Sequence, residues 1–243
     1  MTDLYSNSII RNIYKRPSTN SEVSSQIIYG EKIKVIENKK SWIKIKTIND
    51  NYYGYIKKEK LKKELKIIFK TYKLKTKIFP KSDRNTFLAF NSRLSVINKK
   101  KNFIEFEKGK WVRKIDIKPI NHKEKNFVKV LNYFKNCRYV WGGKSYKGID
   151  CSALIQLFYQ YNNKFFPRDT KDQIKFKSGK KKIIKFKKGD IIFWKGHVAV
   201  CLNRSILIHA YGPKKKVVIM NIKETIELIR KTAKLKVKKI VRI

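Results

Sequence analysis

A cysteine and two histidines carry the clearest potential for chemistry in this 243-residue sequence. Cys151 follows a run rich in glycine and aromatic residues, from Tyr139 to Asp150, and an apolar segment with helical spacing extends from Cys151 to Tyr161. This pattern predicts that Cys151 lies in the first turn of a helix. Backbone N–H groups and the positive end of the helix dipole stabilise a thiolate there, so we expect a lowered thiol pKa and a nucleophilic cysteine.

Two of the three histidines are placed to act on that cysteine. His197 and His209 flank a turn-like segment around Asn203 within strand-like sequence, so we expect them to be close to directly opposed across a hairpin. One imidazole can then accept the thiol proton while the other fixes its tautomer, as in a catalytic triad. We predict His197 as the general base and His209 as the orienting group. A one-residue change of register would separate them.

The same residue types allow other interpretations. Cys151, His197 and His209 could instead bind zinc, but the sequence lacks the short paired ligand spacing of such sites. The other two cysteines, Cys137 and Cys201, are predicted to be buried and inert, since most lone cysteines pack as small apolar side chains. We therefore expect no metal and no cofactor.

The segments that position these residues are of two kinds. Before about residue 121, short alternating strands separated by polar breaks occur in two similar copies of about 60 residues, which suits two small β-barrels. After residue 121, helical spacing at 124–136 and 151–161 precedes four strand-like runs, which indicates an α+β domain. Those runs cover residues 191–194, 198–202, 205–209 and 216–219.

The composition is strongly basic, with a formal net charge of +43 and 42% hydrophobic residues. Lysines are spread through every segment, which favours a compositional bias over a dedicated surface for nucleic acid or membrane. The sequence has no apolar run of about 18 residues and no basic-then-apolar start, so we expect a cytoplasmic protein without a membrane span. Its three cysteines argue against a disulfide framework. The oligomeric state is left open.

Three further residues are interpreted conservatively. His122 lies between the second barrel and the α+β domain, and we predict a solvated linker residue. Trp141 and Trp194 are predicted to serve packing rather than recognition.

The first repeat resembles bacterial SH3 domains, on Gly30-Glu31, the aromatic residue Trp42 and the closing Gly54-Tyr55-Ile56. The second copy, at 68–121, matches less well. The α+β segment resembles the NlpC/P60 cysteine peptidases in the order and spacing of six motifs: Tyr139-x-Trp141-Gly142-Gly143, Asp150-Cys151-Ser152, Pro167-Arg168-Asp169-Thr170-x-x-Gln173, Gly189-Asp190-x-Ile192-Phe193, His197-Val198 and His209.

The resemblance implies an α+β papain-like (NlpC/P60) catalytic domain at residues 122–243, preceded by two small SH3-like β-barrels at residues 1–62 and 63–121. It implies hydrolysis of cell-wall (murein) stem peptides, typically at the bond between γ-D-glutamate and a diamino acid, in peptides with a free N-terminal L-alanine. By the family pattern the substrate contacts would be Tyr139, Asp150, Ser152 and Asp169, with Glu31 and Tyr53 from the first barrel.

Some alternatives stay open. Asp150 could serve only as a helix N-cap, which is the commonest use of aspartate at such a position. The protein could bind peptidoglycan with catalysis incidental, or it could be a papain-like amidase or acyltransferase. The expected partner is a murein peptide and not a nucleic acid.

Overall fold

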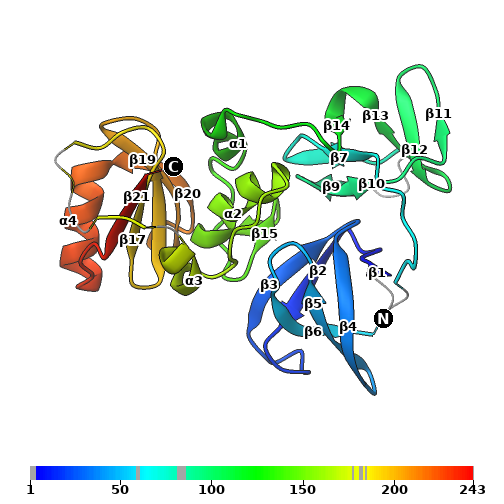
Figure 1. Ribbon diagram of the computed structural model, residues 1–243, viewed down its shortest axis with the longest axis horizontal. Coiled ribbons are helices and arrows are strands. Elements are labelled where there is room, and N and C mark those ends of the chain that lie inside the picture. Colours follow the sequence, from blue (N-terminus) through cyan, green and yellow to red (C-terminus); the bar gives the residue numbers. More distant parts are fainter. Residues whose placement is uncertain are drawn as a thin grey trace. The chain divides into compact units, whose positions relative to one another are not determined.

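The computed structural model describes residues 4–58, 61–80, 86–176, 178–180, 183 and 185–242 (Figure 1). The chain divides into two compact units. The first contains Met1–Lys123 with the short segments Lys144–Tyr146 and Tyr161–Asn163, and the second contains Glu124–Gly143, Lys147–Gln160 and Lys164–Ile243.

The first unit begins with a six-stranded antiparallel sheet. Its strands are β1 (Leu4–Tyr5), β2 (Ile10–Tyr14), β3 (Val23–Ile28), β4 (Lys32–Lys39), β5 (Trp42–Thr47) and β6 (Tyr53–Lys57), in the spatial order β1-β4-β5-β6-β2-β3. Burial alternates along β5, where the isoleucines point inward and the lysines outward. Gly54 lets strands β6 and β2 lie close together, because a Cβ at this position would lie only 2.3 Å from a methyl group of Ile13.

The next stretch of the first unit forms three smaller sheets. The strands are β7 (Phe69–Thr71), β8 (Lys75–Lys77), β9 (Phe87–Ala89), β10 (Arg93–Leu94), β11 (Asn98–Lys99), β12 (Phe103–Glu107), β13 (Lys110–Arg113) and β14 (Ile117–Pro119), with the short 3-10 helix η1 (Lys114–Asp116). They are arranged as β10-β7-β14, β11-β12-β13 and β8-β9. Leu88, Ile104 and Val112 contribute to their shared apolar core.

His122 is not the solvated linker residue that the sequence predicts. Its Nδ1 lies 2.8 Å from the Tyr161 hydroxyl, and its side chain is half-buried. Tyr161 also stacks on Phe90, with ring centroids 5.0 Å apart, and the Lys70 ammonium lies 4.1 Å from its ring centroid. The prediction for His122 was therefore wrong, because the segment Tyr161–Asn163 brings an aromatic partner to it.

The second unit is built on a five-stranded antiparallel sheet, ordered β20-β19-β18-β17-β21. In Figure 1, α4 lies beside this sheet, and α1, α2 and α3 lie together on its other side. The strands are β17 (Asp190–Trp194), β18 (His197–Cys201), β19 (Ile206–Tyr211), β20 (Lys216–Asn221) and β21 (Lys239–Arg242). The helices are α1 (Phe127–Tyr133), α2 (Cys151–Tyr161), α3 (Thr170–Phe176), η2 (Gly212–Lys214) and α4 (Ile222–Ala233), and the short strands β15 (Lys144–Ser145) and β16 (Gly148–Ile149) precede α2 in the chain.

The local sequence explains where the helices of this unit begin and end. Asn221 caps α4 by accepting hydrogen bonds from the N–H groups of Lys223 and Glu224, at 2.9 and 3.3 Å. Asn126 caps α1, and Asn136 has a positive φ of 63° soon after its end. The helix predicted for 124–136 is therefore shorter than expected.

The predicted helix at 151–161 and the four strand-like runs are confirmed as elements of this unit. Trp194 is 1% exposed and serves packing as predicted, as does the buried Cys201. Trp141 contradicts its prediction, because 58% of its surface is exposed. Within the described residues, no helix combines the length and apolar character needed to cross a membrane.

Candidate active site

Cys151 is the first residue of α2, and Asp150 caps that helix. Oδ1 of Asp150 accepts the Ala153 N–H at 2.8 Å and the Ser152 hydroxyl at 3.0 Å, while its carbonyl accepts the Leu154 N–H at 3.2 Å. Such a cap satisfies donors that a helix start leaves without intrahelical partners. The backbone N–H of Cys151 itself, in this first turn, has no acceptor within the helix.

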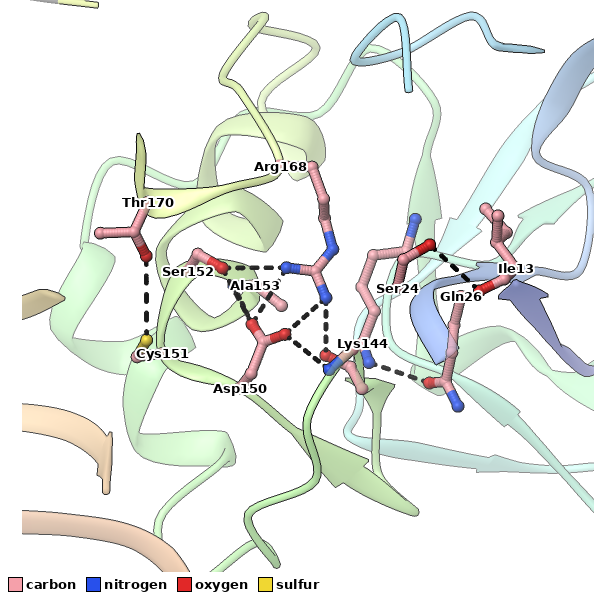
Figure 2. Close-up of polar contacts among 12 residues, drawn as sticks. Ile13, Ser24, Gln26, Lys144, Asp150, Cys151, Ser152, Ala153, Arg168 and Thr170 are labelled. Carbon is pink, nitrogen blue, oxygen red and sulfur yellow. Dashed lines mark hydrogen bonds and ion pairs between the residues drawn. The ribbon is translucent and has the colours of Figure 1, made fainter. Parts of the chain in front are cut away.

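The Arg168 guanidinium holds the capping carboxylate of Asp150 in place (Figure 2). Its Nη2 lies 2.6 Å from Oδ2 of Asp150, and its Nη1 lies 3.0 Å from Oδ1 and 2.9 Å from the Ser152 hydroxyl. The paired side chains are only 1% and 8% exposed. A buried bidentate pair of this kind holds both partners in one geometry.

Gly142 completes the set of donors to Asp150. Its N–H donates to Oδ2 at 3.0 Å, and its φ of +71° is a conformation that favours glycine. Both carboxylate oxygens of Asp150 are therefore engaged in holding the segment around Cys151. The N-cap role is confirmed, and the sequence reasoning did not identify Arg168 as a partner of the cap.

The thiol of Cys151 is enclosed. The residue is 4% exposed, its Sγ lies 4.0 Å from Oγ1 of Thr170 (Figure 2), and the backbone N–H of Val198 donates to the sulfur. Burial and the neighbouring Asp150 carboxylate raise the pKa of Cys151 to about 12, outweighing the stabilising donors. The expected lowered pKa was wrong, because loss of water around the sulfur outweighs the helix dipole.

The two histidines meet, although not in the expected register. The described pairs between β18 and β19 are Val200↔Ile208 and Cys201↔Leu207, which set His197 opposite Tyr211 when the ladder is extended. His197 and His209 are thus diagonal neighbours, offset by two residues from direct opposition, and their predicted proximity across the hairpin is confirmed. An offset of two keeps both side chains on one face of the sheet. Their Nε2 and Nδ1 atoms are 2.9 Å apart.

The imidazole pair is uncharged at neutral pH. Burial lowers the pKa of His197 to about 4, and burial together with His197 and Lys214 lowers the pKa of His209 to about 3. The ring of His209 stacks on Tyr211, with centroids 4.7 Å apart and planes 11° from parallel. A neutral imidazole can accept a proton, which is what a general base requires.

Four of the predicted substrate residues belong to the same unit as Cys151, and one of them is the capping residue Asp150. Burial and the nearby Cys151 raise the pKa of Tyr139, so its hydroxyl remains a donor at neutral pH. Burial also raises the pKa of Asp169, whose backbone carbonyl accepts the N–H groups of Asp172 and Gln173 at the start of α3. The Ser152 hydroxyl is already engaged by Asp150 and Arg168.

The other two predicted substrate residues lie in the first unit. Glu31 is 2% exposed, and its carboxylate oxygens lie 2.7 and 3.0 Å from Nζ of Lys144. It also accepts the Ile28 N–H at 2.8 Å. Tyr53 is 53% exposed, and the Lys46 ammonium lies 5.4 Å from its ring centroid.

Metal ligation was the competing interpretation of Cys151, His197 and His209. Across the part of the chain that the structure describes, no group of three His, Cys, Asp or Glu side chains is arranged to hold a metal ion.

Comparison with protein families gives two matches. Residues 136–233 match the NlpC/P60 family, and residues 13–61 match the bacterial dipeptidyl-peptidase SH3 domain. The first match contains Cys151, His197 and His209, and the second contains Glu31 and Tyr53.

Known relatives and solved structures extend this similarity along the chain. A gamma-D-glutamyl-L-lysine dipeptidyl-peptidase of Bacillus subtilis is 24% identical over 234 residues, covering 86% of this chain and 79% of the relative. Dipeptidyl-peptidase 6 of Lysinibacillus sphaericus is 24% identical, covering 83% and 85%. The crystal structure of an NlpC/P60 family protein from Bacillus cereus superposes with a TM-score of 0.78 at 17% identity, covering 91% of this chain and 94% of that one.

Proposed function

Because the chain carries an NlpC/P60 domain at residues 136–233 and a bacterial SH3 domain at residues 13–61, we propose that it is a cysteine peptidase that hydrolyses cell-wall (murein) stem peptides. The observation that carries the proposal is the arrangement of a cysteine at a capped helix start, beside the strand that bears His197, with His209 bonded to His197.

The bond we propose is the one between γ-D-glutamate and a diamino acid, in a peptide with a free N-terminal L-alanine. The name of the Bacillus subtilis relative, which specifies a γ-D-glutamyl-L-lysine bond, supports this choice. The combination of an SH3 domain with the catalytic domain supports it as well.

In the proposed reaction, the Cys151 thiol and the His197 imidazole both start uncharged. Sγ of Cys151 attacks the amide carbonyl carbon while His197 accepts the thiol proton, so the thiolate forms as it reacts. The Cys151 N–H and the Tyr139 hydroxyl are donors for the resulting oxyanion. Protonated His197 then gives its proton to the leaving amine, and water hydrolyses the thioester.

The substrate contacts proposed are Tyr139, Asp150, Ser152 and Asp169 in the catalytic domain, with Glu31 and Tyr53 in the SH3 domain. Asp150 and Ser152 would act chiefly by shaping the site, since their polar atoms are held by Arg168. An ammonium needs a carboxylate when it is removed from water. A substrate ammonium at Glu31 would have to displace Lys144, which already occupies that carboxylate.

We also propose the finer domain organisation that the repeat suggests. In it, residues 1–62 and 63–121 are two SH3-like barrels and residues 122–243 are the catalytic domain. The three small sheets between Phe69 and Pro119 and their shared core are compatible with a second barrel.

Defined peptides test the substrate. The purified full chain is incubated with L-Ala-γ-D-Glu-L-Lys, its diaminopimelate analogue and their N-acetylated forms, and products are identified by mass spectrometry. We expect L-Ala-γ-D-Glu and the free diamino acid, with acetylation raising KM. The Glu31→Gln variant should lose the preference for a free amine, whereas Glu37→Gln, at an exposed position of the same domain, should retain it. Binding to sacculi without any cleavage would favour the peptidoglycan-binding alternative.

A further inference from the structure

The two ring nitrogens of His209 face partners of different chemistry. Nδ1 lies 2.9 Å from Nε2 of His197, and Nε2 lies 3.4 Å from the thioether sulfur of Met220. A neutral imidazole carries one N–H and one bare lone pair, so only one of these nitrogens donates. The partners decide which one.

The sheet register explains how Met220 reaches the ring. His209 pairs with Val218 across β19 and β20, and Met220 pairs with Leu207. Met220 is therefore the diagonal neighbour of His209 on the same face of the sheet. Its half-buried side chain packs against the apolar core of the second unit, and Tyr211 fixes the plane of the His209 ring by stacking.

A thioether has lone pairs but no proton to give, so it can only accept a hydrogen bond. The contact with Met220 is therefore satisfied when Nε2 of His209 carries the proton. Nδ1 of His209 is then the acceptor, and His197 must carry its own proton on Nε2. This leaves a bare lone pair on Nδ1 of His197, the nitrogen available to take the thiol proton.

The other tautomer of His209, with the proton on Nδ1, is unfavourable and leaves His197 unable to act as a base. If Nδ1 of His209 carried the proton and donated it to His197, then His197 would be protonated on Nδ1 and could not act as a base. The bare Nε2 of His209 would also face the lone pairs of the Met220 sulfur.

We propose that Met220 is a positioning residue that selects the tautomer of both histidines and thereby keeps Nδ1 of His197 free to accept a proton. The inference rests on the proposed function for the roles of His197 and Cys151. A thioether is far too weak a base to be protonated. The Met220 sulfur therefore cannot take a proton from His209, and the proton stays on the histidine pair.

Long-range proton–nitrogen correlation spectra of the full chain test this directly, because they distinguish protonated from bare ring nitrogens. The chain has only three histidines, so the two variants His122→Gln and His197→Gln assign all three ring systems. Three substitutions at Met220 are compared: Met220→Leu removes the acceptor at similar volume, Met220→Glu supplies only acceptors, and Met220→Lys supplies only donors. Ile226→Leu, at another residue packed against the same core, is the matched control.

We expect the wild type, Met220→Glu and Ile226→Leu to carry the His209 proton on Nε2. Met220→Leu should show a mixed population and a kcat lowered about two- to tenfold, the worth of one hydrogen bond. Met220→Lys should move the proton to Nδ1 and lower kcat further than Met220→Glu does.

A wild-type His209 protonated on Nδ1, or equal kcat losses in the Glu and Lys variants, would overturn the proposal. The tautomers are read without substrate, so a wild type that cleaves no murein peptide would defeat the proposed function and leave this test intact.

Discussion

Nε2 of His197 lies 2.9 Å from Nδ1 of His209, although the strands that carry them pair with an offset of two residues. The hydrogen bond joins diagonal neighbours on one face of the sheet. The two imidazoles therefore have unequal roles. Nε2 of His209 faces the Met220 sulfur, so we infer that only His197 has a ring nitrogen available for the thiol.

Substitutions of the two histidines should therefore have unequal effects. We expect His197→Ala to lower kcat about 10²- to 10⁴-fold, the usual contribution of a general base. His209→Ala should lower kcat less, because His197 keeps its basic nitrogen and loses only its orientation. Steady-state kinetics on a murein tripeptide measures both losses. A larger loss in His209→Ala than in His197→Ala would reverse the assigned roles.

The buried pair between Asp150 and Arg168 should be costly to break. Arg168→Met leaves an uncompensated carboxylate at the start of α2, so we expect a loss of about 3–5 kcal/mol in the free energy of unfolding. The double variant Asp150→Asn with Arg168→Met should recover much of that loss, because asparagine is uncharged and still caps a helix. Urea denaturation measures these differences.

The matched control for that experiment is Arg230→Met. Arg230 pairs with Glu227 on the exposed surface of α4, where the side chains are 56% and 45% exposed. An exposed pair of this kind contributes little to the free energy of unfolding, because water screens the two charges. Equal losses in Arg168→Met and Arg230→Met would show that burial of the first pair has no energetic consequence.

The resting enzyme should contain a thiol rather than a thiolate–imidazolium pair. Burial raises the pKa of Cys151 to about 12 and lowers that of His197 to about 4, so both groups are neutral at pH 7. The ultraviolet absorbance of the wild type minus that of Cys151→Ser should show no thiolate up to about pH 9. A thiolate transition below pH 7 in this difference spectrum contradicts the prediction. Cys137 and Cys201 are present in both proteins and cancel.

Stability should fall in mild acid because of the histidine pair. In the unfolded chain a histidine binds a proton near pH 6.5, whereas folding lowers the pKa of His197 to about 4 and of His209 to about 3. Their contribution is fully present above about pH 6.5 and is lost progressively as the pH falls from there to these lower values. Urea midpoints between pH 7.5 and pH 4.5 should fall more steeply for the wild type than for a variant with glutamine at both positions. Parallel curves would count against this account.

The positions of Cys151 and its helix could be predicted from the sequence because their causes are local. A capping aspartate followed by apolar residues at helical spacing specifies the start of α2 without reference to the rest of the chain. The strands that carry His197 and His209 were predictable for the same reason. The sequence also predicted that the two histidines lie on one face of the sheet, because a register change of two residues keeps a side chain on the same face.

Other features depend on contacts that sequence spacing does not contain. The turn around Asn203 shifted the register by two residues, which alternation of apolar residues cannot detect. The pKa of Cys151 was misjudged because burial of the sulfur depends on the packing of Thr170 and Val198. Arg168 stands in a motif, but its bond to Asp150 joins residues 18 positions apart. The pairing of Glu31 with Lys144 spans 113 positions and had no local signal.

Cleavage of L-Ala-γ-D-Glu-L-Lys by Cys151→Ala tests the central claim most directly. The wild type and Cys137→Ala, which removes a cysteine outside the site, should release lysine at similar rates. Cys151→Ala should release it at least about 10³-fold more slowly, because the nucleophile is gone. Release of lysine by folded Cys151→Ala at the wild-type rate would contradict the account.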